Sequence, residues 1–266
     1  MDQYADGHIL SFWDCFGKKT EESKTWLLNI LRKHGCKTVL DVACGPGTES
    51  EMLVEEGFTV LSSDASDVMI TTAKKTRAAR KEAIFSTWEI KLANWLTLPE
   101  DIQKPGEGFD AVICVGNSLP HLPFTDGPDR LQPYKVSLTN IISMVRPGGI
   151  LIFDHRNFDC ILETGKSMLN TVYSNTLTKR IELSIDYEKG VPQMIIMNYI
   201  FPPIGGQQQT RTFSIDFYPV LLNEFNQMLS TILGGTFQHS LYGDFKPYTP
   251  GDVHVKPGVF SHVVRV

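Results

Sequence analysis

The residues best suited to chemistry follow a short apolar segment near the start of the chain. Residues 40–47 read Leu-Asp-Val-Ala-Cys-Gly-Pro-Gly, and Asp64 comes 17 residues after Gly47. This pattern is typical of the opening βαβ unit of nucleoside-binding α/β domains. Such a unit consists of an apolar strand, a glycine-bearing turn, a helix and a second strand that ends in an acidic residue. The small residues Ala43 and Gly45 let the backbone approach a ligand, and the Asp64 carboxylate can accept hydrogen bonds from ribose hydroxyls.

The glycine spacing limits which nucleoside this turn can hold. The motif reads A-x-G-x-G, and no third glycine follows three residues later, where a dinucleotide pyrophosphate would need it. This spacing disfavours a nicotinamide oxidoreductase. We therefore expect a nucleoside without a pyrophosphate, of which S-adenosylmethionine is the common example.

Composition and charge narrow the class of protein. The chain has 266 residues, which is enough for one large α/β domain, and its 42% hydrophobic and 21% charged content is ordinary for a soluble globular protein. A net charge of −5 argues against an extended nucleic-acid surface. We interpret the one basic cluster, residues 74–81, as a solvated helix face and expect no nucleic-acid partner.

Cysteine usage and the N-terminal sequence bear on location. The five cysteines, at positions 15, 36, 44, 114 and 160, show no C-x-x-C spacing, which favours a reducing compartment and predicts no metal site. Residues 1–7 are acidic and polar, unlike a signal peptide, and no apolar run approaches 18 residues. We expect a cytoplasmic protein without membrane contact.

Hydrophobic periodicity predicts alternating helices and strands over the first 154 residues. Residues 109–115 are almost wholly apolar, as expected for a strand buried on both faces. Ser66 is a plausible N-cap for the helix that follows it. The expected helices cover residues 20–33, 48–56, 66–81 and 134–145, and the expected strands cover residues 37–42, 59–64, 88–92, 109–115 and 150–154.

After about residue 165 the pattern becomes that of antiparallel strands joined by turns. Strands are expected near residues 178–188, 193–201 and 209–218, with a turn at Gly205-Gly206. A helix over about 219–232 and strands over 237–242 and 259–265 complete the chain. We predict a single α/β domain over residues 1–266, with a Rossmann-like sheet and a small antiparallel lid, roughly 170–218, inserted after strand five.

A second group of polar residues follows strands four and five. Arg156 lies just past the carboxyl end of strand five, where ligands bind in open α/β sheets, and a guanidinium there can grip a carboxylate through two parallel hydrogen bonds. The alternative is a surface arginine paired with Asp154 or Asp159. Gly116, Asn117 and His121 follow strand four and are expected at the same edge of the sheet.

Several short stretches resemble one enzyme family. Residues 39–45 and Arg-Pro-Gly-Gly at 146–149 look like a class I S-adenosylmethionine-dependent methyltransferase. Seven further stretches, in the right order, resemble glycine N-methyltransferases, and they lie at residues 2–7, 52–58, 93–95, 116–118, 121–123, 154–157 and 243–248. The resemblance runs nearly end to end and is thinnest at 14–24 and 165–215.

The resemblance implies roles for individual residues. The Gly116 carbonyl, Asn117 and His121 would surround the attacking amine, and Arg156 would hold the substrate carboxylate. Tyr173 and Tyr199 would lie near the methyl sulfonium, where hydroxyls can accept weak C–H hydrogen bonds. Asn94 and Trp95 would contact adenine, Ala43, Gly45 and Asp64 would hold the rest of the nucleoside, and further cofactor contacts would come from Tyr4, Trp13, Lys19 and Val115.

The sequence also departs from the family pattern. The family has tyrosine where Phe16, Phe158 and Val259 align here, and also where Ser23 falls. Loss of up to four hydroxyls makes the expected pocket less polar and roomier. The family also implies a homo-oligomer, namely a tetramer.

These observations lead to one expected function and two alternatives. The expected function is direct in-line transfer of a methyl group from S-adenosylmethionine to the amine of glycine, which gives sarcosine. Proton loss from the amine to water, relayed through His121 or Tyr199, is a hypothesis. An enzyme for sarcosine or another small amino acid or amine is favoured by the missing hydroxyls. A weakly catalytic S-adenosylmethionine-binding protein is disfavoured, because such a protein needs neither Arg156 nor Asn117.

Overall fold

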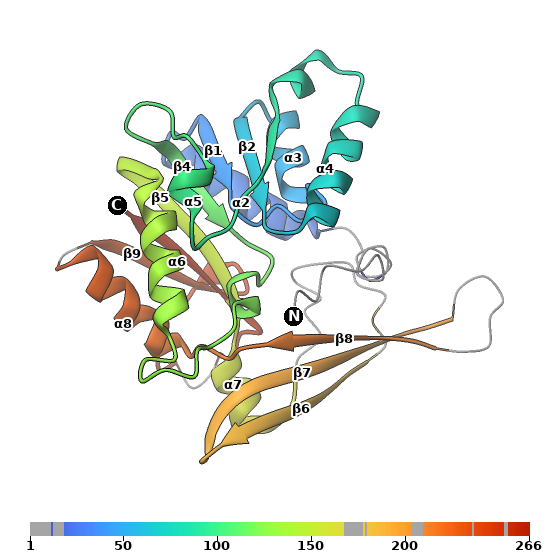
Figure 1. Cartoon of the computed structure of the whole chain (residues 1–266), viewed down its shortest axis with the longest axis vertical. Coiled ribbons are helices and arrows are strands. Elements are labelled where there is room, and N and C mark those ends of the chain that lie inside the picture. Colours follow the sequence, from blue (N-terminus) through green and yellow to red (C-terminus); the bar gives the residue numbers. More distant parts are fainter. Residues whose placement is uncertain are drawn as a thin grey trace.

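The computed structural model describes residues 12, 19–167, 178, 180–203, 210–235, 237–252 and 255–266. An eight-stranded sheet has the strand order β10-β9-β11-β5-β4-β1-β2-β3, and a separate three-stranded sheet has the order β6-β7-β8. Strands β1 to β5 pair in parallel, whereas β9, β10 and β11 add an antiparallel edge. In Figure 1 the three-stranded sheet lies below the main sheet.

The bounds of the elements are as follows. The strands are β1 Thr38–Asp41, β2 Thr59–Asp64, β3 Glu89–Leu92, β4 Phe109–Cys114, β5 Val145–Arg156, β6 Arg180–Glu188, β7 Val191–Phe201, β8 Arg211–Phe217, β9 Gln238–Gly243, β10 Lys246–Pro247 and β11 Val259–Arg265. The helices are α2 Glu21–Lys33, α3 Thr48–Glu55, α4 Asp67–Ala79, α5 Leu98–Asp101, α6 Gln132–Ser143, α7 Phe158–Thr164 and α8 Leu222–Leu233, with 3₁₀ turns at Ala83–Thr87 and Leu119–His121.

Alternation along the parallel strands divides the core between the two faces of the main sheet. Val39 and Ile113 point into a cluster with apolar residues of α2, α3 and α4. Their neighbours Leu40 and Val112 point into a second cluster with residues of α5, α6 and α8. Helices therefore cover both faces, as the apolar sequence of β4 predicts.

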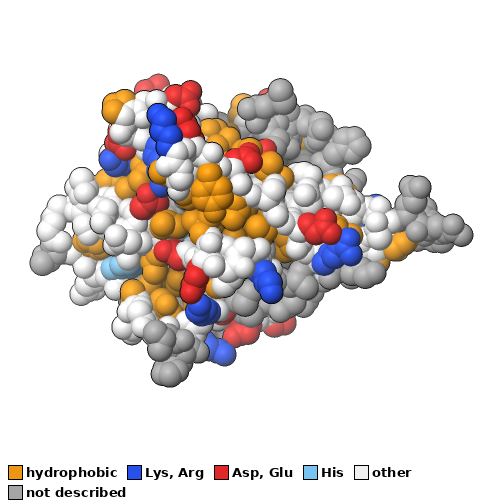
Figure 2. All heavy atoms as spheres, turned by 90° about the horizontal axis from the view of Figure 1, so that it is seen from below, with side chains coloured by type: hydrophobic (Ala, Val, Ile, Leu, Met, Phe, Trp, Pro, Cys, Tyr) orange, Lys and Arg blue, Asp and Glu red, His pale blue; other side chains and the backbone are white. Residues whose placement is uncertain are grey.

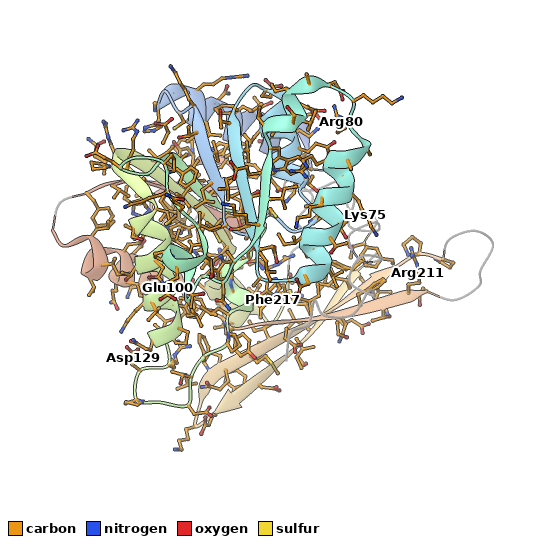
Figure 3. The ribbon with its side chains drawn as sticks, turned by 45° about the horizontal axis from the view of Figure 1, so that its top comes forward. Lys75, Arg80, Glu100, Asp129, Arg211 and Phe217 are labelled. Carbon is orange, nitrogen blue, oxygen red and sulfur yellow. The ribbon has the colours of Figure 1, made fainter. Side chains whose placement is uncertain are left out.

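The three-stranded sheet is fixed by a third apolar cluster. Its inner face packs Met197, Tyr199 and Phe217 against Phe158 of α7 and Met69 of α4. This packing turns β7 and β8 toward the carboxyl ends of the main strands, and Figure 3 shows Phe217 where the two sheets meet.

The predicted alternation of elements is confirmed, with differences at the boundaries. Residues 59–64 and 259–265 form strands with the predicted bounds. Ser66 caps α4, since its hydroxyl accepts from the Met69 N–H at 3.4 Å. The Rossmann-like sheet with an antiparallel insertion after β5 is also confirmed, although β6 starts at Arg180. The turn predicted at Gly205-Gly206 lies outside the described residues, and the single-domain assignment stays a prediction.

The largest difference concerns the start of β5. The helix predicted over residues 134–145 and the strand predicted over 150–154 leave the Arg-Pro-Gly-Gly segment between them, but β5 begins at Val145 and includes this segment. The Gly148 N–H donates to the Val266 carbonyl at 2.7 Å, and the Val266 N–H donates to the Gly149 carbonyl at 3.0 Å. Pairing with the end of the chain therefore extends the strand. A Cβ on Gly149 would lie 2.8 Å from the Asp110 carbonyl oxygen, so only glycine fits this close approach.

Short elements without strong periodicity are not predicted by the sequence. These are α5, α7, β10 and the two 3₁₀ turns. Within the described part of the chain, each helix is too short or too polar to cross a membrane. The face shown in Figure 2 carries scattered Lys and Arg among its described side chains, with hydrophobic side chains between them.

Candidate active site

The candidate site lies at the carboxyl ends of β1, β2, β4 and β5. The strand order places β1 between β2 and β4, so the chain reverses direction across the sheet at β1. Ligands of open α/β sheets bind in the crevice at such a point.

The two glycines of the first turn have different surroundings. Gly45 has a φ of +52°, and a Cβ built on it would meet no atom within 4 Å. Gly47 has a φ of +95°, and its Cβ would lie 2.8 Å from the Trp88 ring. Gly47 is therefore required for packing, whereas Gly45 borders open space on the side where its Cβ would lie.

Asp64 fixes this turn from the end of β2. One carboxylate oxygen accepts the Gly45 N–H and the other accepts the Ser66 N–H, each at 2.9 Å. Each oxygen of an ionised carboxylate has a further lone pair, so the group can still accept hydroxyls of a ligand. The N-cap of α4 is Ser66, so Asp64 does not serve as the helix cap.

A chain of hydrogen bonds between buried polar side chains lies next to the same turn. The sequence analysis does not predict it. The Trp88 ring N–H donates to the Ser62 hydroxyl at 2.7 Å, the Ser62 hydroxyl to that of Ser50 at 2.6 Å, and the Ser50 hydroxyl to Asp41 at 2.6 Å. Burial raises the pKa of the Asp41 carboxyl to about 7. The features that could have indicated it are Asp41 at the end of an apolar strand and the buried Ser62 within β2.

Asn94 and Trp95 stand where β3 ends, beside the carboxyl end of β1. The Trp95 ring N–H donates to the Val42 carbonyl at 2.7 Å, and its ring packs partly buried against the apolar cluster. The Asn94 side-chain oxygen accepts the Leu96 N–H at 2.9 Å, while the residue itself is exposed. Trp95 therefore has a core contact in addition to its predicted role in binding adenine.

Lys19 and Val115 are brought together although they are far apart in sequence. Both line a small cavity together with Asp154, and the Lys19 ammonium pairs with the Glu49 carboxylate of α3 at 2.6 Å. The side chain of Lys19 is 9% exposed. The predicted cofactor residue thus lies against the first turn of the helix that follows the glycines.

Asp154 organises the loop that follows β4. Its carboxylate accepts the N–H groups of Gly116 at 3.1 Å and Asn117 at 2.6 Å. Asn117 has a φ of +60°, a left-handed conformation that asparagine tolerates better than most residues. The alternative that Arg156 pairs with Asp154 or Asp159 is wrong for the described residues, because Asp159 accepts the Leu222 N–H at 3.0 Å and neither carboxylate forms an ion pair with Arg156.

Asn117 connects this loop to the end of β5. Its side-chain oxygen accepts the Arg156 N–H at 2.8 Å. Its buried side-chain nitrogen has no hydrogen-bond partner among the described residues. Because an unsatisfied buried donor is costly, this nitrogen is suited to a ligand atom.

Among the described residues, Arg156 is the one buried charged residue that has an unsatisfied donor. Its residue is 5% exposed, its Nη2 donates to the Tyr199 hydroxyl at 2.8 Å, and its Nη1 donates to the Ser167 hydroxyl at 3.4 Å. Its buried Nε has no partner within the described part of the chain. A buried guanidinium whose partners are neutral hydroxyls lacks a compensating negative charge, which a bound anion would supply.

His121 and Tyr199 are both neutral in the site. The His121 ring lies 4.8 Å from the Phe217 ring, and burial, with a smaller contribution from the Arg156 charge, lowers its pKa to about 3. Burial also raises the pKa of the Tyr199 hydroxyl. Neither group is poised to exchange a proton near neutral pH, which weakens the hypothesis that either relays the amine proton.

The remaining predicted residues have mixed outcomes. Tyr4, Trp13 and Tyr173, like Phe16, lie outside the described residues. Val259 pairs with Arg156 across β5 and β11, so one of the missing hydroxyls falls beside the arginine. Phe158 is fully buried, and its ring lies 6.2 Å from that of Phe217. Ser23 lines the Lys19 cavity. The described residues contain no group of three or more His, Cys, Asp or Glu side chains placed to hold a metal ion.

Comparisons with known proteins agree with this geometry. A profile of the methyltransferase-domain family matches residues 39–149. Glycine N-methyltransferase of Mus musculus is 46% identical over 99% of this chain and 92% of its own length. Glycine/sarcosine N-methyltransferase of Aphanothece halophytica is 30% identical over 99% of this chain and 91% of its own length.

Solved structures share the fold at much lower identity. The CcbJ methyltransferase from Streptomyces caelestis has a TM-score of 0.67 and 15% identity, and the alignment covers 94% of this chain and 91% of that one. The identity and coverage of the mouse relative extend the likeness from the fold to the whole sequence. The chain therefore belongs to the glycine N-methyltransferase family of class I methyltransferases.

Proposed function

We propose that this protein transfers the methyl group of S-adenosylmethionine to the amine of glycine and releases sarcosine. The observation that carries the proposal is the buried guanidinium of Arg156, which has an unpaired Nε and no carboxylate partner among the described residues. A free amino acid supplies the missing carboxylate. The family relationship supports glycine as that amino acid.

The described residues fit S-adenosylmethionine at the glycine turn. Gly45 leaves open space at the turn, and Asp64 holds that turn while keeping lone pairs for ribose hydroxyls. Trp95 and Asn94 would contact adenine, and Lys19 and Val115, which line one small cavity, would supply further cofactor contacts. The bound cofactor supplies a methyl group on a sulfonium, a leaving group that needs no activation.

The chain's own contribution is alignment and exclusion of water. Arg156 would hold the substrate carboxylate, while the Asn117 amide and the Gly116 carbonyl would direct the amine lone pair. With His121 neutral and Tyr199 protonated, no described side chain in this group is a strong base near pH 7. We therefore propose that glycine binds with its amine already deprotonated and that its proton is released to water.

The direct test is detection of the product. The protein is incubated with S-adenosylmethionine carrying an isotopic label on its methyl group and with glycine, and products are identified by mass spectrometry. Labelled sarcosine is expected, together with a strong loss of its formation in Arg156→Lys. Absence of labelled sarcosine from a folded protein that binds S-adenosylmethionine would refute glycine as the substrate.

A second candidate substrate is sarcosine or another small amino acid. Val259 stands opposite Arg156 and Phe158 is buried in α7, and at both positions the family has tyrosine, so the surroundings of the proposed substrate are less polar. The same assay with sarcosine, alanine and small amines distinguishes the candidates. Labelled dimethylglycine from sarcosine would show that the missing hydroxyls admit a methylated amine.

A further inference from the structure

Three histidines form a hydrogen-bonded chain that ends on the backbone of Arg156. His155 Nδ1 lies 2.9 Å from the Arg156 carbonyl oxygen, and His155 Nε2 lies 3.0 Å from His262 Nε2. His262 Nδ1 in turn lies 3.0 Å from His239 Nε2. His155 and His262 are fully buried, whereas His239 is partly exposed. The chain thus runs from the surface at β9, across β11, to the end of β5.

The carbonyl at the end of this chain sets the proton positions in all three rings. Because a carbonyl oxygen can only accept, His155 must carry its proton on Nδ1 and offer Nε2 as an acceptor. His262 then donates from Nε2 and accepts at Nδ1, and His239 donates from Nε2. Burial lowers the pKa of His155 to about 4 and that of His262 well below its usual range, so both rings are neutral near pH 7.

The backbone N–H and carbonyl of Arg156 need side-chain partners because β5 extends beyond the end of the neighbouring strand β4. The last parallel pair joins Cys114 of β4 to Phe153, so no strand faces Arg156 on that side. On the other side Val259 stands opposite Arg156, but its N–H and carbonyl form hydrogen bonds with Asp244 at 3.1 and 3.0 Å. The Arg156 N–H is taken by Asn117 and its carbonyl by His155, so two side chains replace the missing strand.

We propose that His155, held in one tautomer by His262 and His239, is a positioning residue for the substrate carboxylate. It fixes the peptide that carries Arg156, and so the direction in which the guanidinium points. Within the described part of the chain, the Arg156 guanidinium donates to two hydroxyls, those of Tyr199 and Ser167. The inference rests on the proposed function in one respect, which is that Arg156 binds the carboxylate of the amino acid.

A pair of variants separates positioning from packing. In His155→Gln the side-chain amide can still reach His262, but the Arg156 carbonyl loses its donor. Phe225 stacks on His155 with ring centroids 4.3 Å apart, so Phe225→Leu removes packing from the same ring and no hydrogen bond. We expect H155Q to raise KM for glycine about five- to tenfold, the loss of one hydrogen bond, with kcat and KM for S-adenosylmethionine within about twofold. We expect F225L to lower Tm but leave KM for glycine within about twofold.

Nitrogen-15 NMR of the imidazoles provides a readout that does not depend on turnover. At pH 7 we expect His155 as the Nδ1–H tautomer and His262 and His239 as Nε2–H tautomers. An Nε2–H tautomer at His155 would overturn the proposal, as would equal rises of KM in H155Q and F225L. If the wild-type protein methylates another amino acid instead of glycine, KM is compared for that amino acid, so the two proposals fail separately.

Discussion

The guanidinium of Arg156, at the end of β5, donates to the hydroxyl of Tyr199 on β7 at 2.8 Å. This contact joins the main sheet to the three-stranded sheet, which lies below it in Figure 1, and adds to the apolar packing of the third cluster. Both side chains are buried, so the hydrogen bond to the charged group is protected from water. The antiparallel insertion therefore contributes to holding the arginine that we propose as the substrate-binding residue.

Replacement of Tyr199 by Phe tests this contact. The ring keeps its packing while Arg156 Nη2 loses its partner, so we expect KM for glycine to rise about three- to tenfold. Because burial keeps the Tyr199 hydroxyl protonated near neutral pH, the pH profile of kcat should not change. Steady-state kinetics from pH 6 to 9 check both points, and a profile altered in Y199F would assign Tyr199 a role in proton transfer.

Replacement of Asp154 by Asn tests the loop after β4. Asparagine keeps one acceptor oxygen, so one of the N–H groups of Gly116 and Asn117 would face a donor. We expect kcat/KM for glycine to fall by about a hundredfold, since small misplacement of reacting groups is costly.

Asp110→Asn is the matched control for that change. Asp110 lies at the start of the same strand, β4, and accepts from Thr38 and Arg146 at the opposite edge of the sheet. This variant should lose stability with little change of KM. If D154N and D110N lowered kcat/KM equally, Asp154 would be a stabilising residue only.

Replacement of Asp64 by Asn tests the cofactor turn. The carboxylate holds the N–H groups of Gly45 and Ser66, and asparagine can accept from only one of them. We expect Kd for S-adenosylmethionine, measured by calorimetry, to rise by about tenfold or more from the loss of these hydrogen bonds. Asp67→Asn, at an exposed position three residues on, removes the same charge and should leave Kd unchanged. An equal rise of Kd in D64N and D67N would mean that the loss of one negative charge, and not the loss of these hydrogen bonds, weakens cofactor binding.

The buried histidines predict how stability depends on pH. The pKa of His155 is lowered from 6.5 to about 4 on folding, so the unfolded chain binds more protons and stability falls as the pH drops below about 6.5. At pH 5 this group should lower the free energy of unfolding by about 2 kcal/mol relative to pH 7. Urea unfolding at both pH values checks this, because H155Q should lose about 2 kcal/mol less than the wild type. An equal loss in both proteins would contradict it.

The sequence predicts the parts of this site that depend on local pattern. The glycine turn, Asp64, and the polar residues after β4 and β5 all follow apolar strands, and parallel strands end at one edge of a sheet. Those rules place Gly45, Asp64, Asn117 and Arg156 near one another before any coordinates are known.

Other features depend on tertiary contacts and cannot be predicted this way. β5 starts five residues early because the chain end pairs with Gly148 and Gly149. Asp154 supports the Gly116 loop only because β4 and β5 are neighbours, and Asp41 meets Ser50 across the first turn. The role of His155 depends on a ring contributed by β11, more than a hundred residues away.

The central claim is that Arg156 selects the substrate through its carboxylate. Its most direct test compares initial rates with glycine and with glycinamide, which has nearly the same size but no negative charge, in the wild type and in Arg156→Lys. We expect the wild type to prefer glycine by about a hundredfold in kcat/KM and the variant to lose most of that preference, because lysine cannot reproduce the planar fork. Equal rates with both substrates in the wild type, or an unchanged preference in R156K, would contradict the account.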